Sequence, residues 1–155
     1  MSVKLSLFSN NFPDFFIIDQ DGSVDIAEID SDEDRRDATF EWTGPQMSFG
    51  ETGQLLRAKE PLGFCLRIMS FDEFRIDSKF FTGIIDPDVA AEVRADSTFT
   101  LVPAEIDPAQ FSFRSVRFPD RFLRHRDFHL FAERVNSPPE LQSACFRRNA
   151  PLSSP

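Results

Sequence analysis

Short runs in which hydrophobic and polar residues alternate recur along the chain. Residues 3–7 (VKLSL), 64–68 (FCLRI) and 111–116 (FSFRSV) all follow this pattern. Because successive side chains of a strand point to opposite faces, alternation with a period of two predicts half-buried β-strands. No long segment has a persuasive helical period, and only residues 89–94 could form a helical turn. The pattern therefore predicts an all-β protein.

Three segments of the sequence also align with one another. Each has a Phe near its start and a second Phe 28 residues later, and the pairs are Phe12 with Phe40, Phe71 with Phe99, and Phe118 with Phe146. One such unit cannot bury its apolar face alone, so three units are expected to close on a common core. The repeat predicts a β-trefoil with three pseudo-symmetric four-stranded repeats, in which each set of three equivalent Phe residues forms one layer of the core.

The spacing of these landmarks sets the expected boundaries. The whole chain, residues 1–155, is interpreted as a single β-trefoil domain with repeats over about 1–46, 62–103 and 104–152. About a dozen extra residues separate the first two repeats. We expect an insertion loop over 47–62, where glycines and a proline interrupt the sequence.

The aromatic residues and cysteines favour burial. There are 19 Phe residues, one Trp and no Tyr. Phe has no polar atom, so this composition indicates a large apolar core more than an aromatic binding platform. Cys65 and Cys145 lie in apolar, strand-like runs far apart in the sequence. They are interpreted as buried, reduced thiols.

The overall composition excludes several classes of protein. Hydrophobic residues make up 41% of the chain, which is too many for a disordered protein. The net charge of −9 argues against a nucleic-acid partner, because phosphate binding needs clustered Lys and Arg. No run of 18 apolar residues predicts a membrane span, and residues 1–11 do not have the pattern of a signal peptide. We expect a monomer that is cytoplasmic as the chain stands, or secreted if a leader was removed.

Nothing in the sequence predicts catalysis, a metal or a cofactor. Residues 30–34 (DSDED) are similar to the start of a calcium loop, but Arg35 stands where an EF-hand needs Gly, so a solvated acidic loop is favoured. With 26 acidic residues, some pair could fall at the separation used by glycosidases by chance. There is no Gly-rich phosphate loop, no nucleophile motif and no CxxC motif.

The third repeat resembles a known family. Residues 112–126 (SFRSVRFPDRFLRHR) are closely similar to the motif of the arabinofuranosidase B domain, the arabinose-binding family 42 carbohydrate-binding module. Residues 94–99 (RADSTF) resemble its second motif, and residues 3–42 resemble a more diverged copy. The resemblance implies a β-trefoil. It also implies a non-catalytic module that accompanies an α-L-arabinofuranosidase catalytic domain and holds the arabinofuranose side chains of arabinoxylan.

The resemblance also implies site residues. In that family a pocket uses a His from the second-strand motif and an Asp from the closing motif of the same copy. The closing Asp is present as Asp37 in the first copy and as Asp96 in the second, whereas Ser143 replaces it in the third. A carboxylate accepts two sugar hydroxyls, and an imidazole accepts or donates one more.

The second-strand His is present only as His125, in the third copy and between Arg124 and Arg126. Asp19 stands at this position in the first copy, and Asp77 or Ser78 stands there in the second. No copy therefore keeps both halves of the pair.

Two hypotheses follow. The first is a non-catalytic carbohydrate-binding module for arabinofuranosyl side chains, with ligand-binding residues His125, Arg124, Arg126, Asp96 and Asp37. The second is a degenerate trefoil that has lost its sugar pockets and binds a protein partner. Residues 1–46 carry 11 acidic and 3 basic residues, a net charge of −8, and would be the contact face in that case.

Overall fold

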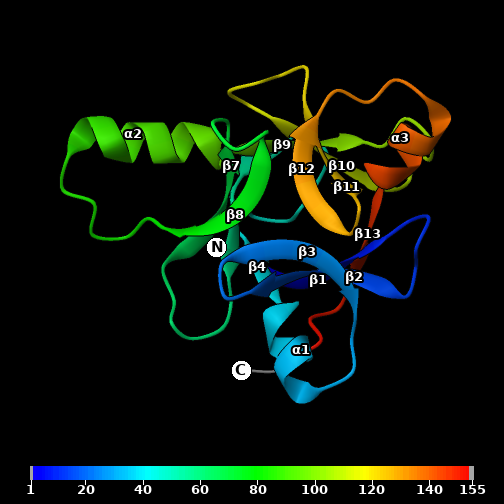
Figure 1. Cartoon of the computed structure of the whole chain (residues 1–155), viewed down its shortest axis with the longest axis horizontal. Helices are drawn as coiled ribbons and strands as arrows, with labels where there is room; N and C mark the ends of the chain where they lie inside the picture. Colours follow the sequence, from blue (N-terminus) through cyan, green and yellow to red (C-terminus); the bar gives the residue numbers. More distant parts are fainter. Residues whose placement is uncertain (1, 154–155) are drawn as a thin grey trace.

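Strands dominate the structure, a computed structural model that describes residues 2–153 (Figure 1). The strands of the first part are β1 (Val3–Ser9), β2 (Phe15–Gln20), β3 (Ser23–Glu28) and β4 (Phe40–Trp42). The middle part contains β5 (Thr52–Gly53), β6 (Leu55–Arg57), β7 (Phe64–Met69), β8 (Arg75–Phe80) and β9 (Phe99–Pro103). The last part contains β10 (Phe111–Ser115), β11 (Phe122–Arg126), β12 (His129–Glu133) and β13 (Phe146–Asn149).

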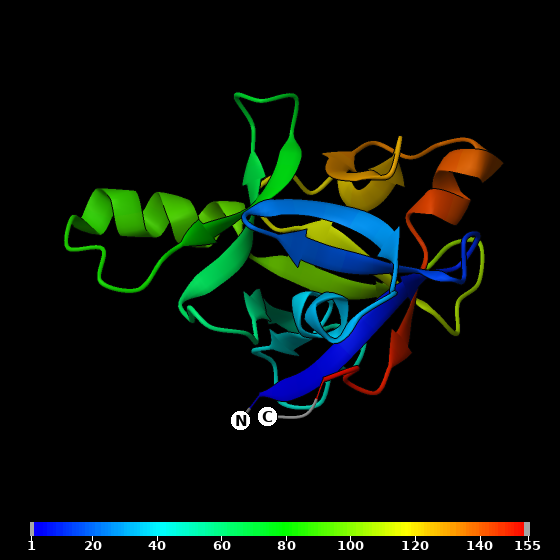
Figure 2. The ribbon, with the colours of Figure 1, turned by 60° about the horizontal axis from the view of Figure 1, so that its bottom comes forward.

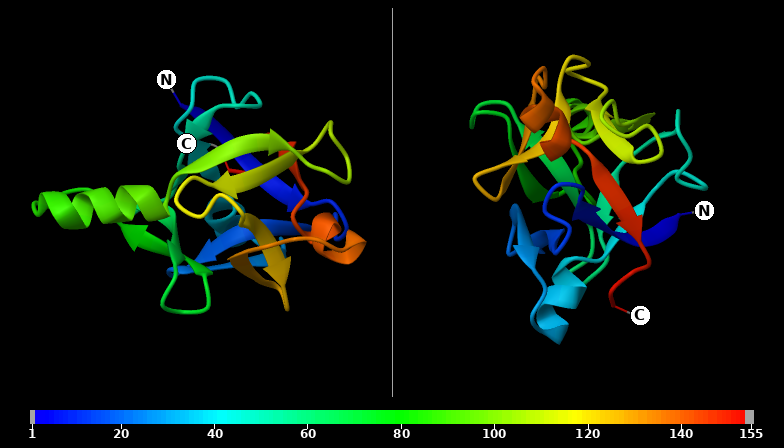
Figure 3. Two further views of the ribbon diagram at one scale, coloured as in Figure 1. Left: turned by 90° about the horizontal axis from the view of Figure 1, so that it is seen from above. Right: turned by 90° about the vertical axis from the view of Figure 1, so that its right-hand side faces the viewer.

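The strands close into a barrel. Hydrogen-bonded neighbours lead from β10 through β13, β1, β4, β6, β7, β8, β3, β12 and β11 back to β10, which makes a circuit of ten strands. The first and last strands, β1 and β13, pair antiparallel and lie side by side in Figure 3. Closure of the circuit leaves few unpaired strand edges. The prediction of an all-β fold is confirmed.

Three hairpins follow one another around one end of the barrel, β2–β3, β7–β8 and β11–β12. A carbonyl in the turn of each hairpin accepts a backbone hydrogen bond from the last strand of the next one. The pairs are Gly22 O with Ser78 N at 2.9 Å, Phe74 O with Ala132 N at 2.8 Å, and Phe128 O with Ile26 N at 2.9 Å. The same contact thus recurs three times in a cycle, so the three hairpins are structurally equivalent.

This cycle defines three copies. We label β1–β4 the first copy, β5–β9 the second and β10–β13 the third. The closing strand pairs in the same register each time, with Phe40 opposite Leu5, Phe99 opposite Gly53 and Phe146 opposite Phe111. The two consecutive short strands β5 and β6 therefore open the second copy, as β1 opens the first copy and β10 opens the third.

The prediction that residues 47–62 form an insertion loop is wrong, because this segment contains the strands β5 and β6. The strand over 64–69, expected to open the second copy, is the second strand, β7. Gly53 concealed the opening strand, because a Gly breaks the apolar alternation. A Cβ atom at Gly53 would lie 2.9 Å from both the Trp42 and Thr43 side chains, so Trp42 fills the space that an apolar side chain would occupy.

One helix precedes the closing strand of each copy. The helices are α1 (Asp32–Asp37), α2 (Pro87–Asp96) and α3 (Pro138–Ser143). Their first turns are capped by the side chains of Ser31, Asp86 and Ser137. The acidic segment 30–34 therefore begins α1, where negative charge favours a helix N-terminus. Figures 1 and 2 show α2, the longest of the three, extending beyond the barrel.

The closing Phe residues lie in the core as predicted. Phe40, Phe99 and Phe146 are all fully buried in one cluster. The other predicted layer is wrong: Phe118 is partly buried, Phe12 is 41% exposed, and Phe71 is 81% exposed in the turn between β7 and β8. Cys65 and Cys145 are buried and free, as expected. Within residues 2–153 no helix is long and apolar enough to cross a membrane.

Candidate functional site

The predicted closing residues occupy one structural position. Asp37, Asp96 and Ser143 are the last residues of α1, α2 and α3, and all three are buried. Each lies at a junction between copies, where its helix and the second strand meet the segment that follows the next copy's opening strand. The first junction joins the first copy to the second. The second junction joins the second copy to the third, and the third junction joins the third copy back to the first.

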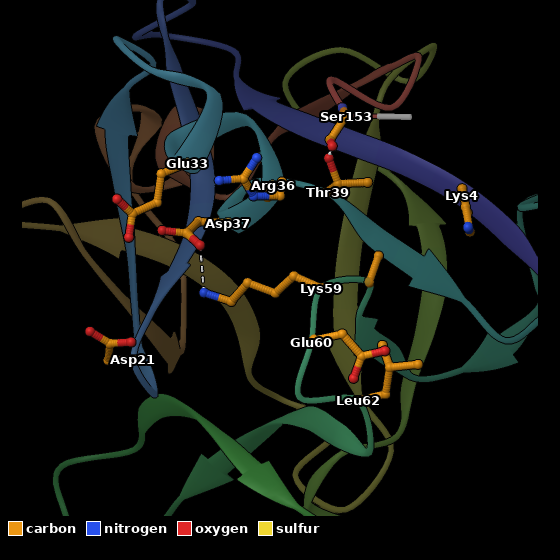
Figure 4. A pocket seen from close by; sticks show the side chains of 11 residues that line it. Lys4, Asp21, Glu33, Arg36, Asp37, Thr39, Lys59, Glu60, Leu62 and Ser153 are labelled. Atoms are coloured by element: carbon orange, nitrogen blue, oxygen red, sulfur yellow. Dashed lines mark hydrogen bonds and ion pairs between the residues drawn. The ribbon is translucent and has the colours of Figure 1, made fainter. Parts of the chain in front are cut away.

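The first junction is built from four charged residues. Lys59 Nζ donates to Asp37 Oδ1 at 2.5 Å and to the backbone oxygen of Asp19 at 2.7 Å (Figure 4). Asp19 Oδ2 accepts a hydrogen bond from Arg57 Nε at 2.9 Å. Arg57 and Lys59 come from the end of β6 and the residues after it. Both predicted positions of the first copy, Asp19 and Asp37, are therefore bound by cations of the second copy.

A pocket of about 680 Å³ opens beside this junction, as Figure 4 shows. Asp37 and Lys59 point toward each other across it, and Thr39 lies at its edge. Among the described residues Asp37 Oδ2 has no hydrogen-bond partner. Every fully buried side-chain oxygen of these residues does have a partner, so Oδ2 is not fully buried and is accessible to solvent. The pocket is lined by Lys4, Asp21, Glu33, Arg36, Asp37, Thr39, Ala58, Lys59, Glu60, Leu62 and Ser153.

The second junction is closed by arginines. Asp96 Oδ2 accepts hydrogen bonds from Arg67 Nε at 3.0 Å and Nη2 at 2.7 Å, and Oδ1 accepts one from Arg117. Both carboxylate oxygens are thus occupied. In the second hairpin the position equivalent to Asp19 is Ile68, which pairs with Ile76 across the two strands as Asp19 pairs with Val24. Asp77 and Ser78 lie on the following strand, β8. The predicted placement of Asp77 or Ser78 at the His position is therefore wrong.

The third junction is neutral. His125 Nε2 lies 2.8 Å from Asn11 Oδ1 and 3.0 Å from Ser9 Oγ. An amide oxygen only accepts, so we assign the ring hydrogen to Nε2. Burial, helped by the positive charge of Arg124, lowers the pKa of His125 to about 4. Ser143 Oγ donates to the backbone oxygen of Glu140 at 2.6 Å, whereas the His125 ring is bound by Ser9 and Asn11.

This lowered pKa predicts a pH dependence of stability. A His with a pKa near 6.5 when unfolded and about 4 when folded binds more protons in the unfolded state between these values. Its stabilising contribution is complete above about pH 6.5 and is lost as the pH falls toward 4. We expect the free energy of unfolding to fall by about 2 to 3 kcal/mol more between about pH 7 and about pH 4.5 in the wild type than in His125→Gln. Urea unfolding at both pH values measures this, and equal pH slopes in the two proteins would contradict it.

Arg124 and Arg126 make no hydrogen bond to the side chains of Ser9, Asn11 or His125 in the described part of the chain, although Arg124 Nε donates to the backbone oxygen of His125 at 3.3 Å. Arg124 Nη1 and the Arg126 guanidinium both bind Glu133, at 3.4 Å and 3.0 Å. The Glu133 hydrogen bond raises the pKa of Arg126. Together with Arg121 and Arg134 they line an open cavity of about 380 Å³. The five predicted ligand-binding residues are therefore spread over separate places and do not form one site.

The sequence interpretation missed the partners of these residues. Lys59 and Arg117 both stand two residues beyond the end of an opening strand and pair with the closing Asp of the preceding copy. Asn11 has the same place in the first copy, opposite a third copy that has lost its Asp. A sequence alignment with β6 in its correct register would have shown this correspondence. Within residues 2–153 no group of three His, Cys, Asp or Glu side chains could hold a metal ion.

Comparisons with known proteins agree with this architecture. An arabinofuranosidase complexed with arabinofuranosyl-alpha-1,2-xylobiose matches 97% of the chain with a TM-score of 0.77 and 18% identity. A β-trefoil named BEL matches 95% of the chain and is itself covered to 92%, with a TM-score of 0.67 and 13% identity. A Polyporus squamosus lectin bound to a Neu5Ac-containing epitope matches 94% of the chain and is covered to 48%, with a TM-score of 0.66 and 7% identity.

The chain spans about a third of the arabinofuranosidase structure, 31% of its length. No curated protein sequence matches it. One family model matches residues 70–154, which is 85 of the 155 residues and includes the motif around His125. The chain belongs to the alpha-L-arabinofuranosidase B (ABFB) domain family.

Proposed function

We propose that this chain is a non-catalytic carbohydrate-binding module that holds arabinofuranosyl side chains of arabinoxylan-type polysaccharides. In this proposal it is a monomeric β-trefoil made of the three pseudo-symmetric copies defined above. The observation that carries the proposal is the pocket beside the first junction, where one oxygen of a closing Asp is free to accept a hydrogen bond.

The chemistry of this pocket suits a small polyhydroxylated ligand. Asp37 Oδ2 can accept a sugar hydroxyl, and Lys59 Nζ has donated only two of its three hydrogens. Lys59 also fixes the Asp37 carboxylate from the opposite side, so the acceptor is already oriented before a ligand arrives. A volume of about 680 Å³ accommodates one furanose ring with part of the chain that carries it.

The equivalent residues of the other copies support a single pocket of this kind. Asp96 already accepts three hydrogen bonds from Arg67 and Arg117, on both of its oxygens, and it is only 3% exposed, so it is poorly placed to accept a hydroxyl. The third copy has Ser143 in place of the closing Asp. We therefore assign arabinofuranosyl binding to Asp37 and its pocket.

Calorimetric titration with arabinofuranosyl-xylobiose, and with xylobiose as the matched ligand, tests the assignment. Asp37→Asn keeps the size of the side chain but removes the charged acceptor, and we expect about a tenfold rise in Kd for the arabinosylated ligand. Asp14→Asn is the matched control, because Asp14 is exposed and lies outside the pocket. No saturable binding by the wild type, or equal affinity in the Asp37→Asn protein, would reject the proposal.

The second candidate function is a protein-interaction module with lost sugar pockets. Its specific support is the second junction, where arginines occupy the closing Asp. In that case titrations with both oligosaccharides would be flat. A protein recovered by pull-down would then bind the acidic first copy, and its binding would weaken with salt.

A further inference from the structure

Two phenylalanines form an exposed aromatic surface at the third junction. Phe12, at the start of the first copy, is 41% exposed, and Phe128, in the turn of the third hairpin, is 51% exposed. Their rings are nearly parallel, with an interplanar angle of 24° and centroids 6.0 Å apart. Phe15 supports Phe128 from one side at 5.4 Å, and the His125 ring lies 5.1 Å from Phe12. The exposed rings are therefore held in place by aromatic neighbours.

The backbone beneath Phe128 is unfavourable for a bulky residue. Asp127 and Phe128 have φ angles of 54° and 66°, the left-handed conformation of a tight hairpin turn. The first copy has Asp21 and Gly22 at the same two positions, and Gly22 has a φ of 98°. A non-Gly residue in this region costs on the order of 1 kcal/mol. Phe128 thus carries a backbone cost that a Gly would not, while half of its ring stays exposed to solvent.

The second junction provides an internal comparison. Phe74 and Phe118 occupy the same two positions as Phe128 and Phe12, and Phe74 also has a positive φ of 61°. Their rings meet edge to face, at 87°, and both are partly buried against the core. The Arg121 guanidinium covers Phe74 at 3.5 Å from the ring centroid. At the third junction the residue in the place of Arg121 is Phe15, and no guanidinium within residues 2–153 covers the exposed rings as Arg121 covers Phe74.

The hydrogen-bonded side chains beside Phe12 are uncharged, whereas the exposed Asp127 carboxylate lies next to Phe128 in its turn. His125 is neutral at pH 7, and its partners Ser9 and Asn11 are neutral as well. Asn10 and Gln142 join the two copies through a side-chain hydrogen bond of 2.7 Å. The first and second junctions are instead held by the ion pairs of Asp37 and Asp96. Bare aromatic faces next to neutral hydroxyl, amide and imidazole groups suit an uncharged, polyhydroxylated ligand.

We propose that Phe12 and Phe128 form a stacking platform for the pyranose backbone of the polysaccharide. The C–H groups on one face of a pyranose ring pack against the electron-rich face of a Phe ring, while its hydroxyls reach the neutral groups at the edge. The identity of the polysaccharide is taken from the proposed function. The platform adds to it a second contact, which does not require arabinose. Two weak contacts on one chain raise the overall affinity through their effective concentration.

Titration with xylohexaose, which lacks arabinose, tests the platform. Phe128→Gly removes the ring and supplies the residue that the first copy uses in this turn, so relief of the positive φ offsets part of the lost ring packing and the variant should still fold. We expect its Kd for xylohexaose to rise about tenfold while its Kd for arabinofuranosyl-xylobiose changes far less. Phe71→Gly is the matched control, because Phe71 is an exposed Phe in the equivalent turn of the second hairpin.

The two proposals fail in different ways. Asp37→Asn should leave xylohexaose binding unchanged, because its pocket is at another junction. Binding of arabinofuranosyl-xylobiose without any binding of xylohexaose would overturn the platform and leave the proposed function standing. Equal xylohexaose affinity in wild type and Phe128→Gly, or an equal loss in Phe71→Gly, would also overturn it.

Discussion

Asp19→Ala should lower the free energy of unfolding by about 3 to 5 kcal/mol, because it leaves a buried guanidinium without its counter-ion. The side chains of Asp19 and Arg57 are 1% and 6% exposed, and Arg57 Nε lies 2.9 Å from Asp19 Oδ2. Asp19 Oδ1 also accepts the backbone N–H of Gly22 at 3.0 Å, so the substitution breaks a turn contact as well. Arg57 packs over the Phe64 ring at 3.9 Å and cannot move into water without losing that contact.

Urea unfolding of three further proteins makes this prediction specific. Asp14→Ala removes an exposed carboxylate and should change the free energy of unfolding by less than about 0.5 kcal/mol. Asp19→Leu combined with Arg57→Met replaces both charges by apolar groups and should recover much of the loss seen in Asp19→Ala. A loss below about 1 kcal/mol in Asp19→Ala, or a double variant less stable than Asp19→Ala, would show that the pair is not buried as described.

Phe99→Ala should destabilise the protein by about 3 to 5 kcal/mol, whereas Phe71→Ala should change its stability by less than about 0.5 kcal/mol. Phe99 is fully buried in the common core with Phe40 and Phe146. Truncation removes its burial and leaves a cavity among well-packed neighbours. Phe71 is 81% exposed in a hairpin turn, so truncation removes little buried surface.

Thermal and urea unfolding of both variants give the comparison. The alignment of Phe71 with Phe118 predicts that both Phe71 and Phe99 anchor the second copy. In the observed structure β5 and β6 open the second copy. This register predicts that only Phe99 anchors that copy. Similar losses of stability in the two variants would contradict the observed register.

The architecture was predictable because its strongest signal is repeated. Each closing Phe is the first residue of a short strand that pairs in the same register, so the same residue type recurs at three equivalent positions of the sequence. The second copy was misread because its opening strand contains Gly53 in place of an apolar residue, with the Trp42 side chain filling the gap. The helices α1 and α3 are only six residues long, too short to show a helical period.

The candidate site was predictable only in part. Asp37 and Asp96 lie at the ends of two helices, and His125 lies on the second strand of its copy. Their partners, Lys59, Arg117 and Asn11, come from the following copy. Such contacts depend on how the copies close around the barrel. A motif within one copy carries no information about them.

The exposed aromatic surface illustrates the same difficulty. With 19 Phe residues and no Tyr, the composition favours a core use of aromatic rings. Phe12 and Phe128 are ordinary members of that set in the sequence, separated by more than a hundred positions. Only the turn conformation of Phe128 and the closure of the third junction bring their rings together at the surface.

Backbone amide shifts of ¹⁵N-labelled protein, followed during titration with arabinofuranosyl-xylobiose, test the proposed binding site most directly. The largest saturable shifts should occur at Asp37, Thr39 and Lys59, around the pocket of the first junction. Unchanged spectra, or shifts confined to the arginine-lined cavity around Arg124 and Arg126, would contradict this prediction.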